Sequence, residues 1–381
     1  MRVGFYLLLV VMFLESFSGD DFSATRTPSS WPLWEQYQSC CIQIDGRVID
    51  FSRNGATTSE GQGYALFFAL VQNDPHFFGK ILRWTENNLS SGDFSQHLPA
   101  WLWGKGKNGV WGVLDQNSAA DADLWICYDL IQAGQRWNRP EYAIKGIHLA
   151  HLIATREFGN LPGQGEFPLG GARGFHPIPS LWRLNPSYFP PFLLRFMESY
   201  LNLSPWKGLT HRFSRMLESV SGCGFPPDWT SFEYGKGWRS DSVSGPLGSY
   251  DAIRVYLWAG MTSEQDPDIK TIRKSLGGWE KKGIAEPTMY GNGKTCQGYG
   301  PAPLGFQAAY LPYLAKVDPP KVKSLERSVR KRLSLKKSIG YYDYNLVLFG
   351  TGYLENRFHF GPRGTLHVTG DMVPWGKLSP I

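Results

Sequence analysis

The sequence of 381 residues predicts one large globular domain built mostly from α-helices. Apolar residues recur at helical spacing in several separate segments, and residues that favour helix starts come just before several of them. Long loops rich in glycine, proline and asparagine join these segments. No change of composition after Trp31 indicates a domain boundary. Many helices joined by long loops leave room for a helical barrel or toroid.

The predicted helices follow one another along the chain. Ser59 and Gln62 resemble a capping box that opens a helix at Glu60. Asp74 and Pro75 are typical of an N-cap followed by proline at the first helical position. The apolar residues that mark the later helices are Phe77, Phe78, Ile81 and Leu82; Leu124, Trp125, Tyr128 and Ile131; Ile144 and Ile147; Phe192, Phe196 and Tyr200 after Pro190 and Pro191; and Ile253, Leu257 and Trp258 after Asp251.

The last ordered element predicted from the sequence is a short β-hairpin. Residues 357–360 and 365–368 alternate polar and apolar side chains, and Gly361, Pro362 and Gly364 lie between them. Glycine and proline between two such runs are typical of a hairpin turn.

The first residues predict export. Arg2 precedes an apolar run from Val3 to Leu14, which is long enough for a signal peptide and too short to span a bilayer. We therefore predict a signal peptide over 1–19, a polar linker over 20–30 and a single domain over 31–381. The protein is expected to be secreted or periplasmic without stable membrane insertion. An uncleaved membrane anchor is the alternative interpretation.

The charge and cysteine content exclude several function classes. The net charge is +6, and many of the basic residues lie between Lys316 and Lys337. Leu325, Val329 and Leu333 recur there at helical spacing, which favours the solvated face of an amphipathic helix over a nucleic-acid site. The five cysteines show no zinc spacing, so we expect no metal and no cofactor. Cys127 is predicted to be a buried thiol.

The aromatic content points toward a sugar ligand. Aromatic residues make up 15% of the chain, with 15 tryptophans. Tryptophan carries an N–H group that needs a partner when buried, so core packing accounts for only about half of them. Trp101 and Trp103 lie close together beside Lys105 in a predicted loop. Flat aromatic faces in a groove suit sugar rings.

The segment Thr58–Tyr64 places a single carboxylate, Glu60, at the start of a buried helix. Because water is scarce there, desolvation is expected to raise its pKa and allow it to act as a general acid near neutral pH. The alternative is a first-turn glutamate favoured by the helix dipole. The residues that follow are mainly apolar or aromatic, among them Tyr64, Leu66, Phe67, Phe68 and Leu70.

Two further motifs place aspartates at helix starts. Asp121 and Asp123 are two residues apart, so they do not share one helical face. Asp251 begins a helix, and Arg254 lies one turn along it. An arginine beside a carboxylate favours its ionised form, which a general base needs. Ordinary helix capping is the alternative interpretation for these aspartates.

Taken together and in order, these motifs resemble glycoside hydrolase family 8. Within it, the likeness is strongest to the endoglucanases associated with bacterial cellulose synthase. It runs from about Trp34 to Trp375. The segments that carry the resemblance are 45–50, 58–64, 97–105, 117–126, 185–188, 235–238, 249–258 and 341–350.

The resemblance implies an (α/α)6 barrel with an open groove across one end. It also implies hydrolysis of β-1,4 linkages with inversion, for which the two carboxyl groups stand roughly 6.5–9.5 Å apart. Glu60 would be the general acid and Asp251 the general base. The implied substrate-binding residues are Asp121 at the cleavage point, Tyr188 and Tyr250 in the same subsite, Arg254 as the residue that orients the carboxylates, and Trp101 and Trp103 as sugar-stacking residues.

The chain departs from the family's usual helix signature at three positions. Ala120 replaces a serine or threonine, Cys127 replaces an alanine, and Asp129 replaces a serine or alanine. The loss of a hydroxyl beside Asp121 weakens how that aspartate is held, whereas the other two changes affect packing. All three bear on efficiency more than on the type of reaction.

The prediction is an endo-β-1,4-glucanase that acts on cellulose, with cellulose synthase as the partner complex and a role in bacterial cellulose biosynthesis. A chitosanase or xylanase would use the same chemistry, although the positive net charge argues against a chitosan substrate. A second class is a glucan-binding accessory of the synthase with little turnover, because tryptophan-rich loops serve binding equally well.

Overall fold

The computed structural model describes residues 30–278, 289–290, 302–335 and 339–369. The predicted signal peptide, the linker before Ser30 and Cys296 lie outside these residues. Trp31 begins a unit that is compact in its own right.

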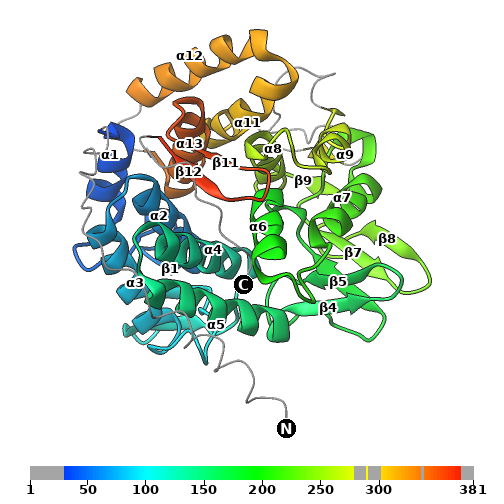
Figure 1. The fold of residues 1–381 in the computed structure, drawn as a ribbon, viewed down its shortest axis with the longest axis horizontal. Coiled ribbons are helices and arrows are strands. Elements are labelled where there is room, and N and C mark those ends of the chain that lie inside the picture. The colour runs from blue at the N-terminus through cyan, green and yellow to red at the C-terminus, as the bar shows by residue number, and fades with distance from the viewer. Residues whose placement is uncertain (1–29, 279–288, 291–301, 336–338, 370–381) are drawn as a thin grey trace, which may run out of the picture. The chain divides into compact units, whose positions relative to one another are not determined.

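The helices of this unit alternate along the chain between an outer and an inner position around a common axis (Figure 1). Within the described residues there are six of each, so the predicted (α/α)6 architecture is confirmed. The outer helices are α1 (Pro32–Cys41), α3 (Pro75–Leu89), α5 (Pro140–Arg156), α7 (Leu209–Val220), α9 (Ile269–Lys274) and α12 (Pro319–Leu335). The inner helices are α2 (Ser59–Val71), α4 (Ala120–Arg136), α6 (Pro191–Leu201), α8 (Ala252–Met261), α11 (Leu304–Val317) and α13 (Tyr341–Leu354).

Burial explains which helices are inner. Every residue of α8 is buried, and in α2 every residue except Glu60 is buried. A helix that is apolar on all sides must be surrounded by protein. The outer α12 is the opposite case, since Val329 is its single buried residue. The basic segment is therefore a solvated amphipathic helix, as predicted.

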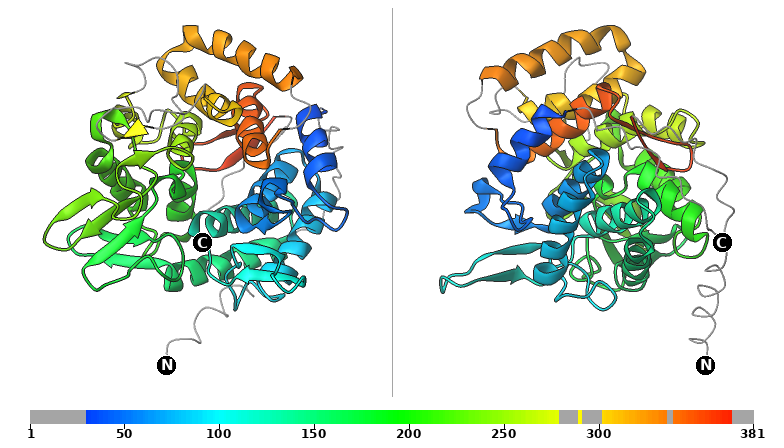
Figure 2. Two further views of the ribbon diagram at one scale, coloured as in Figure 1. Left: turned by 180° about the vertical axis from the view of Figure 1, so that it is seen from behind. Right: turned by 60° about the vertical axis from the view of Figure 1, so that its left-hand side comes forward.

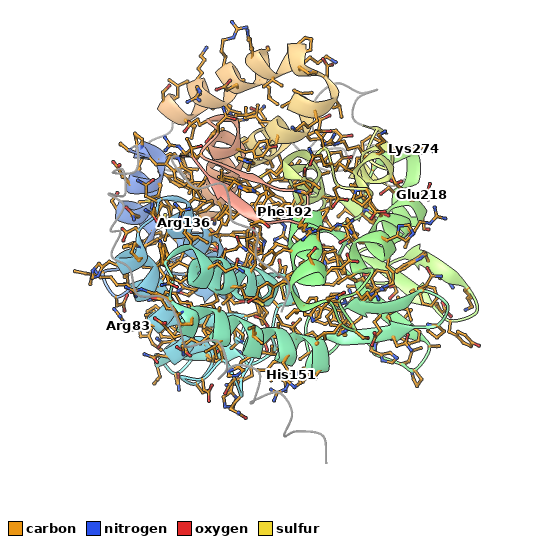
Figure 3. All side chains as sticks on the ribbon, viewed as in Figure 1. Arg83, Arg136, His151, Phe192, Glu218 and Lys274 are labelled. Carbon is orange, nitrogen blue, oxygen red and sulfur yellow. The ribbon has the colours of Figure 1, made fainter. Side chains whose placement is uncertain are left out.

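Aromatic side chains fill the centre of the ring. Phe67 of α2 stacks on Phe349 of α13 at 5.3 Å between ring centroids and meets Trp125 of α4 edge-on at 5.1 Å. Trp258 of α8 lies 5.5 Å from Trp125. In Figure 3, Phe192 lies near this centre, whereas charged side chains such as Glu218 lie at the rim. Seven tryptophans of the described segments are buried, in line with the predicted half: Trp31, Trp34, Trp84, Trp125, Trp182, Trp206 and Trp258.

The predicted terminal hairpin is confirmed as β11 (Phe358–Phe360) and β12 (Leu366–Val368). Phe360 stacks on Phe192 of α6 at 3.8 Å, and the Tyr128 hydroxyl donates to the carbonyl of Gly364 at 2.8 Å. Gly364 has a φ of +73°, and a Cβ there would overlap the backbone of Phe192. The hairpin thus packs against one end of the inner ring (Figure 2).

Short antiparallel strands occupy the loops, and the sequence did not predict them. They form pairs or three-stranded sheets, and several precede the first turn of an inner helix. Their bounds are β1 (Thr57–Thr58), β2 (Leu102–Lys105), β3 (Trp111–Asp115), β4 (Phe158–Leu161), β5 (Gly165–Pro168), β6 (Leu181–Leu184), β7 (Thr230–Glu233), β8 (Gly237–Ser240), β9 (Leu247–Gly248) and β10 (Met289–Tyr290). The short 3₁₀ turns of the described residues are η2 (Phe51–Arg53), η3 (Pro186–Tyr188) and η4 (Gly222–Gly224).

The predicted helix starts are mostly correct. Asp74 caps α3 by accepting a hydrogen bond from the Phe77 N–H at 2.8 Å. The capping box at Ser59 is wrong by one residue, because Thr58 caps α2 and accepts from the Gly61 N–H at 3.1 Å. Gln62 instead turns inward and accepts from the Val48 N–H at 2.6 Å.

Cys127 is buried, as predicted. No helix among the described residues has the length and apolar character needed to span a membrane.

Candidate active site

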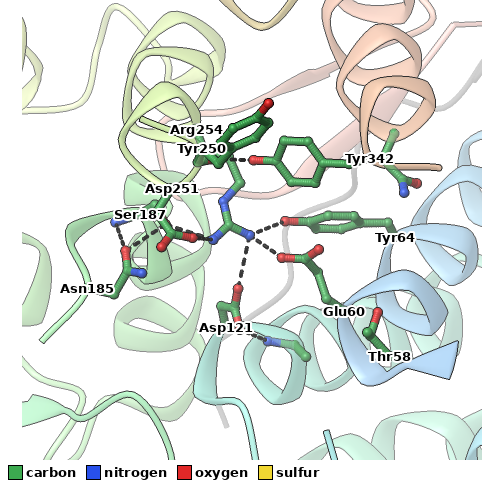
Figure 4. A network of polar contacts seen from close by, with 12 residues as sticks. Thr58, Glu60, Tyr64, Asp121, Asn185, Ser187, Tyr250, Asp251, Arg254 and Tyr342 are labelled. Carbon is green, nitrogen blue, oxygen red and sulfur yellow. Dashed lines mark hydrogen bonds and ion pairs between the residues drawn. The ribbon is translucent and has the colours of Figure 1, made fainter. Parts of the chain in front are cut away.

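Three acidic residues and one arginine meet where α2, α4 and α8 begin (Figure 4). Glu60 and Asp121 are each the second residue of their helix, and Asp251 is the N-cap of α8. The side chain of Arg254 is 2% exposed and donates to all three carboxylates. Its Nη1 donates to Glu60 and to Asp121 Oδ2, the latter at 3.2 Å, and its Nη2 donates to Asp251 Oδ1 at 2.7 Å.

The arginine has further partners that hold it in place. Its Nη1 donates to the Tyr64 hydroxyl at 3.1 Å, and its Nη2 donates to the Ser187 hydroxyl at 2.9 Å. Its guanidinium carbon lies 5.7 Å from the ring centre of Tyr188. A guanidinium has a rigid planar fork of donors, so these contacts fix where each carboxylate can lie.

The three carboxylates differ in their exposure. The side chain of Asp121 is 5% exposed, against 21% for Glu60 and 30% for Asp251. Burial raises the pKa of Asp121 to about 7, with Arg254 opposing the shift and the charge of Glu60 adding to it. Glu60 and Asp251 are thus the two carboxylates best able to meet a ligand, whereas Asp121 lies beneath them.

The start of α2 is held by local contacts. Thr58 caps the helix, and its hydroxyl lies 3.1 Å from the hydroxyl of Tyr341 on α13. Gly61 follows Glu60 because a Cβ at that position would collide with the Tyr341 ring. The helix that carries Glu60 is therefore fixed both by its own cap and by its neighbour.

The start of α8 is held differently. The Oδ1 atom of Asp228 accepts hydrogen bonds from three backbone N–H groups, those of Ser249 at 2.7 Å, Asp251 at 3.1 Å and Ala252 at 2.7 Å. Burial, followed by the charge of Asp251, raises the pKa of Asp228 to about 7, and these backbone bonds oppose the shift.

A model of the glycosyl hydrolases family 8 matches residues 10–356. The chain belongs to family 8 of the glycosyl hydrolases. It is 42% identical over 352 residues to an endoglucanase of Xanthomonas axonopodis pv. citri (strain 306), covering 90% of this chain and 91% of that one. It is 38% identical over 375 residues to an endoglucanase of Escherichia coli (strain K12), covering 97% and 96%. The crystal structure of the endo-1,4-D-glucanase from Vibrio fischeri ES114 matches with a TM-score of 0.84 and 36% identity, covering 89% and 99%.

The predicted membership of family 8 and the predicted enzyme class are therefore confirmed. The structure also brings together four residues that the resemblance assigned to one site, namely Glu60, Asp121, Asp251 and Arg254. Their roles in the reaction stay predictions and are taken up below.

The two predicted tyrosines both lie beside this family 8 site, Tyr188 against Arg254 and Tyr250 next to Asp251. Tyr188 ends η3, and burial raises its pKa well above the ordinary value. Tyr250 precedes Asp251 and is 51% exposed. Its ring packs edge-on against Phe306 at 4.9 Å, and the Tyr342 hydroxyl donates to its carbonyl. The backbone contact and the ring contact thus hold Tyr250, while about half of the residue stays exposed to solvent.

The two predicted tryptophans lie beside the start of α2, outside the contacts of Arg254. The carbonyl of Trp101 accepts from the Ser59 N–H at 3.1 Å. Trp103, on β2, stacks on Trp111 of β3 at 5.3 Å, and the Arg47 guanidinium lies 4.5 Å from the Trp103 ring centre. The β2–β3 hairpin extends away from the helices in the right-hand view of Figure 2. Trp111 stacks on Trp103 and is 45% exposed, but it was not predicted from the sequence as a sugar-stacking residue.

The departures from the family 8 helix signature have different surroundings. Ala120 is buried at the start of α4, and Asp121 Oδ1 accepts from the N–H of Ala122 at 2.8 Å. The Cys127 thiol donates to the Gly146 carbonyl of α5 at 3.1 Å. Asp129 is fully buried, and among the described residues neither of its carboxyl oxygens has a hydrogen-bond partner. Burial raises its pKa well above the ordinary value.

A second acidic pair lies behind Asp121. Asp123 and Glu157 are both buried, and the Ser118 hydroxyl donates to Glu157. Burial raises the pKa of Glu157 to about 8, and burial and then the charge of Glu157 raise that of Asp123. Asp123 is therefore not an ordinary helix cap.

Sequence reasoning missed Tyr64, Ser187 and Asp228 as site residues. Tyr64 and Ser187 lie within motifs that carry the family resemblance, so the motif marked them without giving a role. Asp228 follows Pro226 and Pro227 in a loop. Nothing in the sequence around Asp228 marks it as a site residue, because its hydrogen-bond partners lie more than 20 residues further along the chain.

Proposed function

We propose that this family 8 glycosyl hydrolase is an endo-β-1,4-glucanase that cleaves cellulose internally with inversion. The observation that carries the proposal is the placement of Glu60 and Asp251 on separate nitrogen atoms of one buried arginine. Both carboxylates are accessible from outside, as the two groups of an inverting hydrolase must be. The relatives named endoglucanases support the choice of substrate.

In the proposed reaction, Glu60 is the general acid and Asp251 is the general base. Asp251 accepts a proton from a water molecule as the water oxygen bonds to the anomeric carbon. The glycosidic bond breaks, and Glu60 gives its proton to the leaving oxygen. The proton held by Asp251 then returns to Glu60 through solvent. The water attacks from the face opposite the leaving group, so the configuration at the anomeric carbon inverts.

The remaining residues bind and orient. Arg254 holds both carboxylates, so that neither can rotate away from the sugar. Asp121 lies beneath them and would bind a sugar hydroxyl at the cleavage point. Tyr188 and Tyr250 would line the same subsite, and Trp101 and Trp103 would stack on sugar rings further along the chain.

The cellular setting is proposed on different grounds. The apolar run from Val3 to Leu14 after Arg2 supports export to the periplasm or the medium. There the enzyme would trim amorphous cellulose as a synthase complex makes it. Detection of the chain in the cytoplasm alone, by fractionation of the native host, would contradict this setting.

The experiment measures release of reducing ends from carboxymethylcellulose by the wild type, Glu60→Gln and Asp251→Asn. We expect activity in the wild type and a loss of about 10²–10⁴-fold in each variant. Binding of cellulose without product release by the wild type would favour the accessory function instead. Equal activity in all three proteins would remove both carboxylates from the mechanism. Activity on xylan or chitosan in place of cellulose would change the substrate but not the chemistry.

A further inference from the structure

The start of α8 combines an aspartate at the N-cap position with a cap that comes from elsewhere. An aspartate at an N-cap ordinarily uses its own side chain to accept from the first backbone N–H groups of the helix. Among the described contacts, the carboxylate of Asp251 makes no such capping bond. It accepts from Arg254 instead, at 2.7 Å.

Asp228 supplies the capping acceptor for α8 that the side chain of Asp251 does not provide. One oxygen, Oδ1, accepts from the N–H groups of Ser249, Asp251 and Ala252. The backbone of Asp228 is tied to the same junction, because its N–H donates to the Leu247 carbonyl at 2.7 Å. Asp228 is therefore joined to the segment 247–252 through both its backbone and its side chain.

The packing around this junction is close. A Cβ at Gly248 would overlap the carbonyl of Pro226, two residues before Asp228. A loop that approaches a helix start this closely can move little without moving the helix start as well. The position of the Asp251 backbone is thus coupled to the position of Asp228.

We propose that Asp228 is a positioning residue for the general base, which it acts on by capping α8 from outside so that the Asp251 carboxylate is left for the reaction. The inference rests on the proposed role of Asp251. If Asp251 had to cap its own helix, its carboxylate would face backbone N–H groups and could not also accept from Arg254 in the present geometry.

The electrostatics of the pair agree with this role. Two carboxylates in one site repel each other when both are ionised. Burial and the charge of Asp251 raise the pKa of Asp228 to about 7, so Asp228 is partly protonated near neutral pH and this repulsion is reduced. A neutral carboxylic acid still has a carbonyl oxygen that accepts hydrogen bonds. Asparagine has the same acceptor without the charge, so Asp228→Asn preserves the proposed function of the side chain, whereas Asp228→Ala removes it.

The chain offers a matched control in Asp74. It caps α3 by accepting from the Phe77 N–H at 2.8 Å, and α3 is an outer helix that carries none of the site residues. Asp74→Ala removes a capping acceptor without touching the junction at α8. It reports what the loss of a cap does to stability alone.

The experiment measures kcat, KM and Tm on carboxymethylcellulose for the wild type, Asp228→Asn, Asp228→Ala and Asp74→Ala. Because small misplacement of a reacting group costs about 10²-fold in rate, we expect kcat of Asp228→Ala to fall by about that factor with KM within about threefold. We expect Asp228→Asn to retain kcat within about threefold. Asp74→Ala should lower Tm while leaving kcat at the wild-type value.

Three results would overturn the inference. One is a kcat of Asp228→Ala within about threefold of the wild type. Another is a loss in Asp228→Asn equal to that in Asp228→Ala, because the charge and not the acceptor would then matter. The third is a loss that falls on KM alone. If Asp228→Ala does not fold, Asp228→Ser replaces it, since a shorter hydroxyl acceptor should give a kcat between those of the wild type and Asp251→Asn.

A double variant separates this inference from the proposed function. If Asp228 acts through Asp251, adding Asp228→Ala to Asp251→Asn should lower kcat by less than about threefold beyond the single variant. A further loss of about 10²-fold would show that Asp228 acts independently of Asp251. An inactive wild type would overturn the proposed function, and the inference with it, whereas an active wild type with an active Asp228→Ala would overturn the inference alone.

Discussion

The starts of α2 and α8 hold the two candidate catalytic carboxylates in contrasting ways. Glu60 follows a cap that is adjacent in sequence, because Thr58 accepts from the Gly61 N–H. Asp251 is itself at the cap position, and the acceptor for its helix is Asp228, 23 residues earlier. One helix start is capped by a residue next to it in sequence and the other by a residue of a distant loop. The comparison teaches that a carboxylate at a helix start can be left for chemistry only when another group caps the helix.

Both helix starts depend on one arginine, and its removal should have the largest effect. Arg254→Met removes the donors shared by Glu60, Asp121 and Asp251, so we expect kcat to fall by about 10³-fold. Arg254→Lys should restore little of this loss, since an ammonium lacks the planar fork that reaches separate carboxylates. Steady-state kinetics on a soluble β-1,4-glucan measures both. A lysine variant with nearly wild-type kcat would show that only the charge matters.

Asp129 lies in the middle of α4 and so contrasts with the carboxylates at the starts of α2 and α8. Asp129 is buried in α4 with its pKa raised, so the folded state keeps its proton while the unfolded state loses it above about pH 4. The stability associated with this group is therefore fully present below that pH and declines as pH rises toward the folded-state pKa. Asp129→Asn cannot ionise, so its free energy of unfolding relative to the wild type should increase as pH rises above about 4, by at most ~1.4 kcal/mol for each pH unit.

Urea unfolding of Asp129→Asn and the wild type at pH 4, 5, 6 and 7 measures this difference. Leu130→Ala, at the next buried position of α4, is the control, because it should destabilise by an amount that does not change with pH. A constant difference between Asp129→Asn and the wild type across this range would contradict the raised pKa.

The local cap of α2 should give a smaller effect. Thr58→Ala removes the acceptor for the Gly61 N–H, so we expect the free energy of unfolding to fall by about 1 kcal/mol. Because Tyr341 and the buried face of α2 also hold this helix, kcat should fall by less than about tenfold. Thr58→Ser keeps the hydroxyl and serves as the control. A loss of kcat as large as that of Asp228→Ala would mean that the two helix starts are equally dependent on their caps.

The smallest expected effect concerns thiol chemistry away from both helix starts. Burial raises the pKa of the Cys127 thiol well above its ordinary value, so the thiol should not react with iodoacetamide in the folded protein. Cys223 is exposed and should react. Mass spectrometry of the peptides after alkylation at pH 8, with and without urea, distinguishes the two. Modification of Cys127 in native protein at the rate of Cys223 would contradict its burial.

Much of the helical architecture could be predicted from the sequence. Helices such as α3 and α6 carry strong signals, since Asp74 and Pro75 or Pro190 and Pro191 precede apolar residues at helical spacing. The strands from β1 to β10 could not be predicted, because runs of two to five residues give too little alternation to distinguish them from loops, whereas glycine and proline between two runs marked the β11–β12 hairpin.

The candidate site could be predicted in part. Glu60, Asp121 and Asp251 stood out as carboxylates at helix starts, and Arg254 lies one turn from Asp251 in the same helix. Ser187 and Asp228 act only through tertiary contacts, on a side chain or a backbone far away in the sequence. A single sequence contains no signal for such contacts, since nothing near Asp228 indicates that three N–H groups of another segment lie within reach of it.

The central claim is that Glu60 and Asp251 act together in a single displacement, which requires inversion at the anomeric carbon. Proton NMR during the first minutes of hydrolysis of a soluble cello-oligosaccharide tests it most directly, because it detects the new reducing end before mutarotation. The account predicts that the α-anomer appears first. Initial formation of the β-anomer would contradict it, because retention requires a covalent intermediate in which one of these carboxylates is a nucleophile.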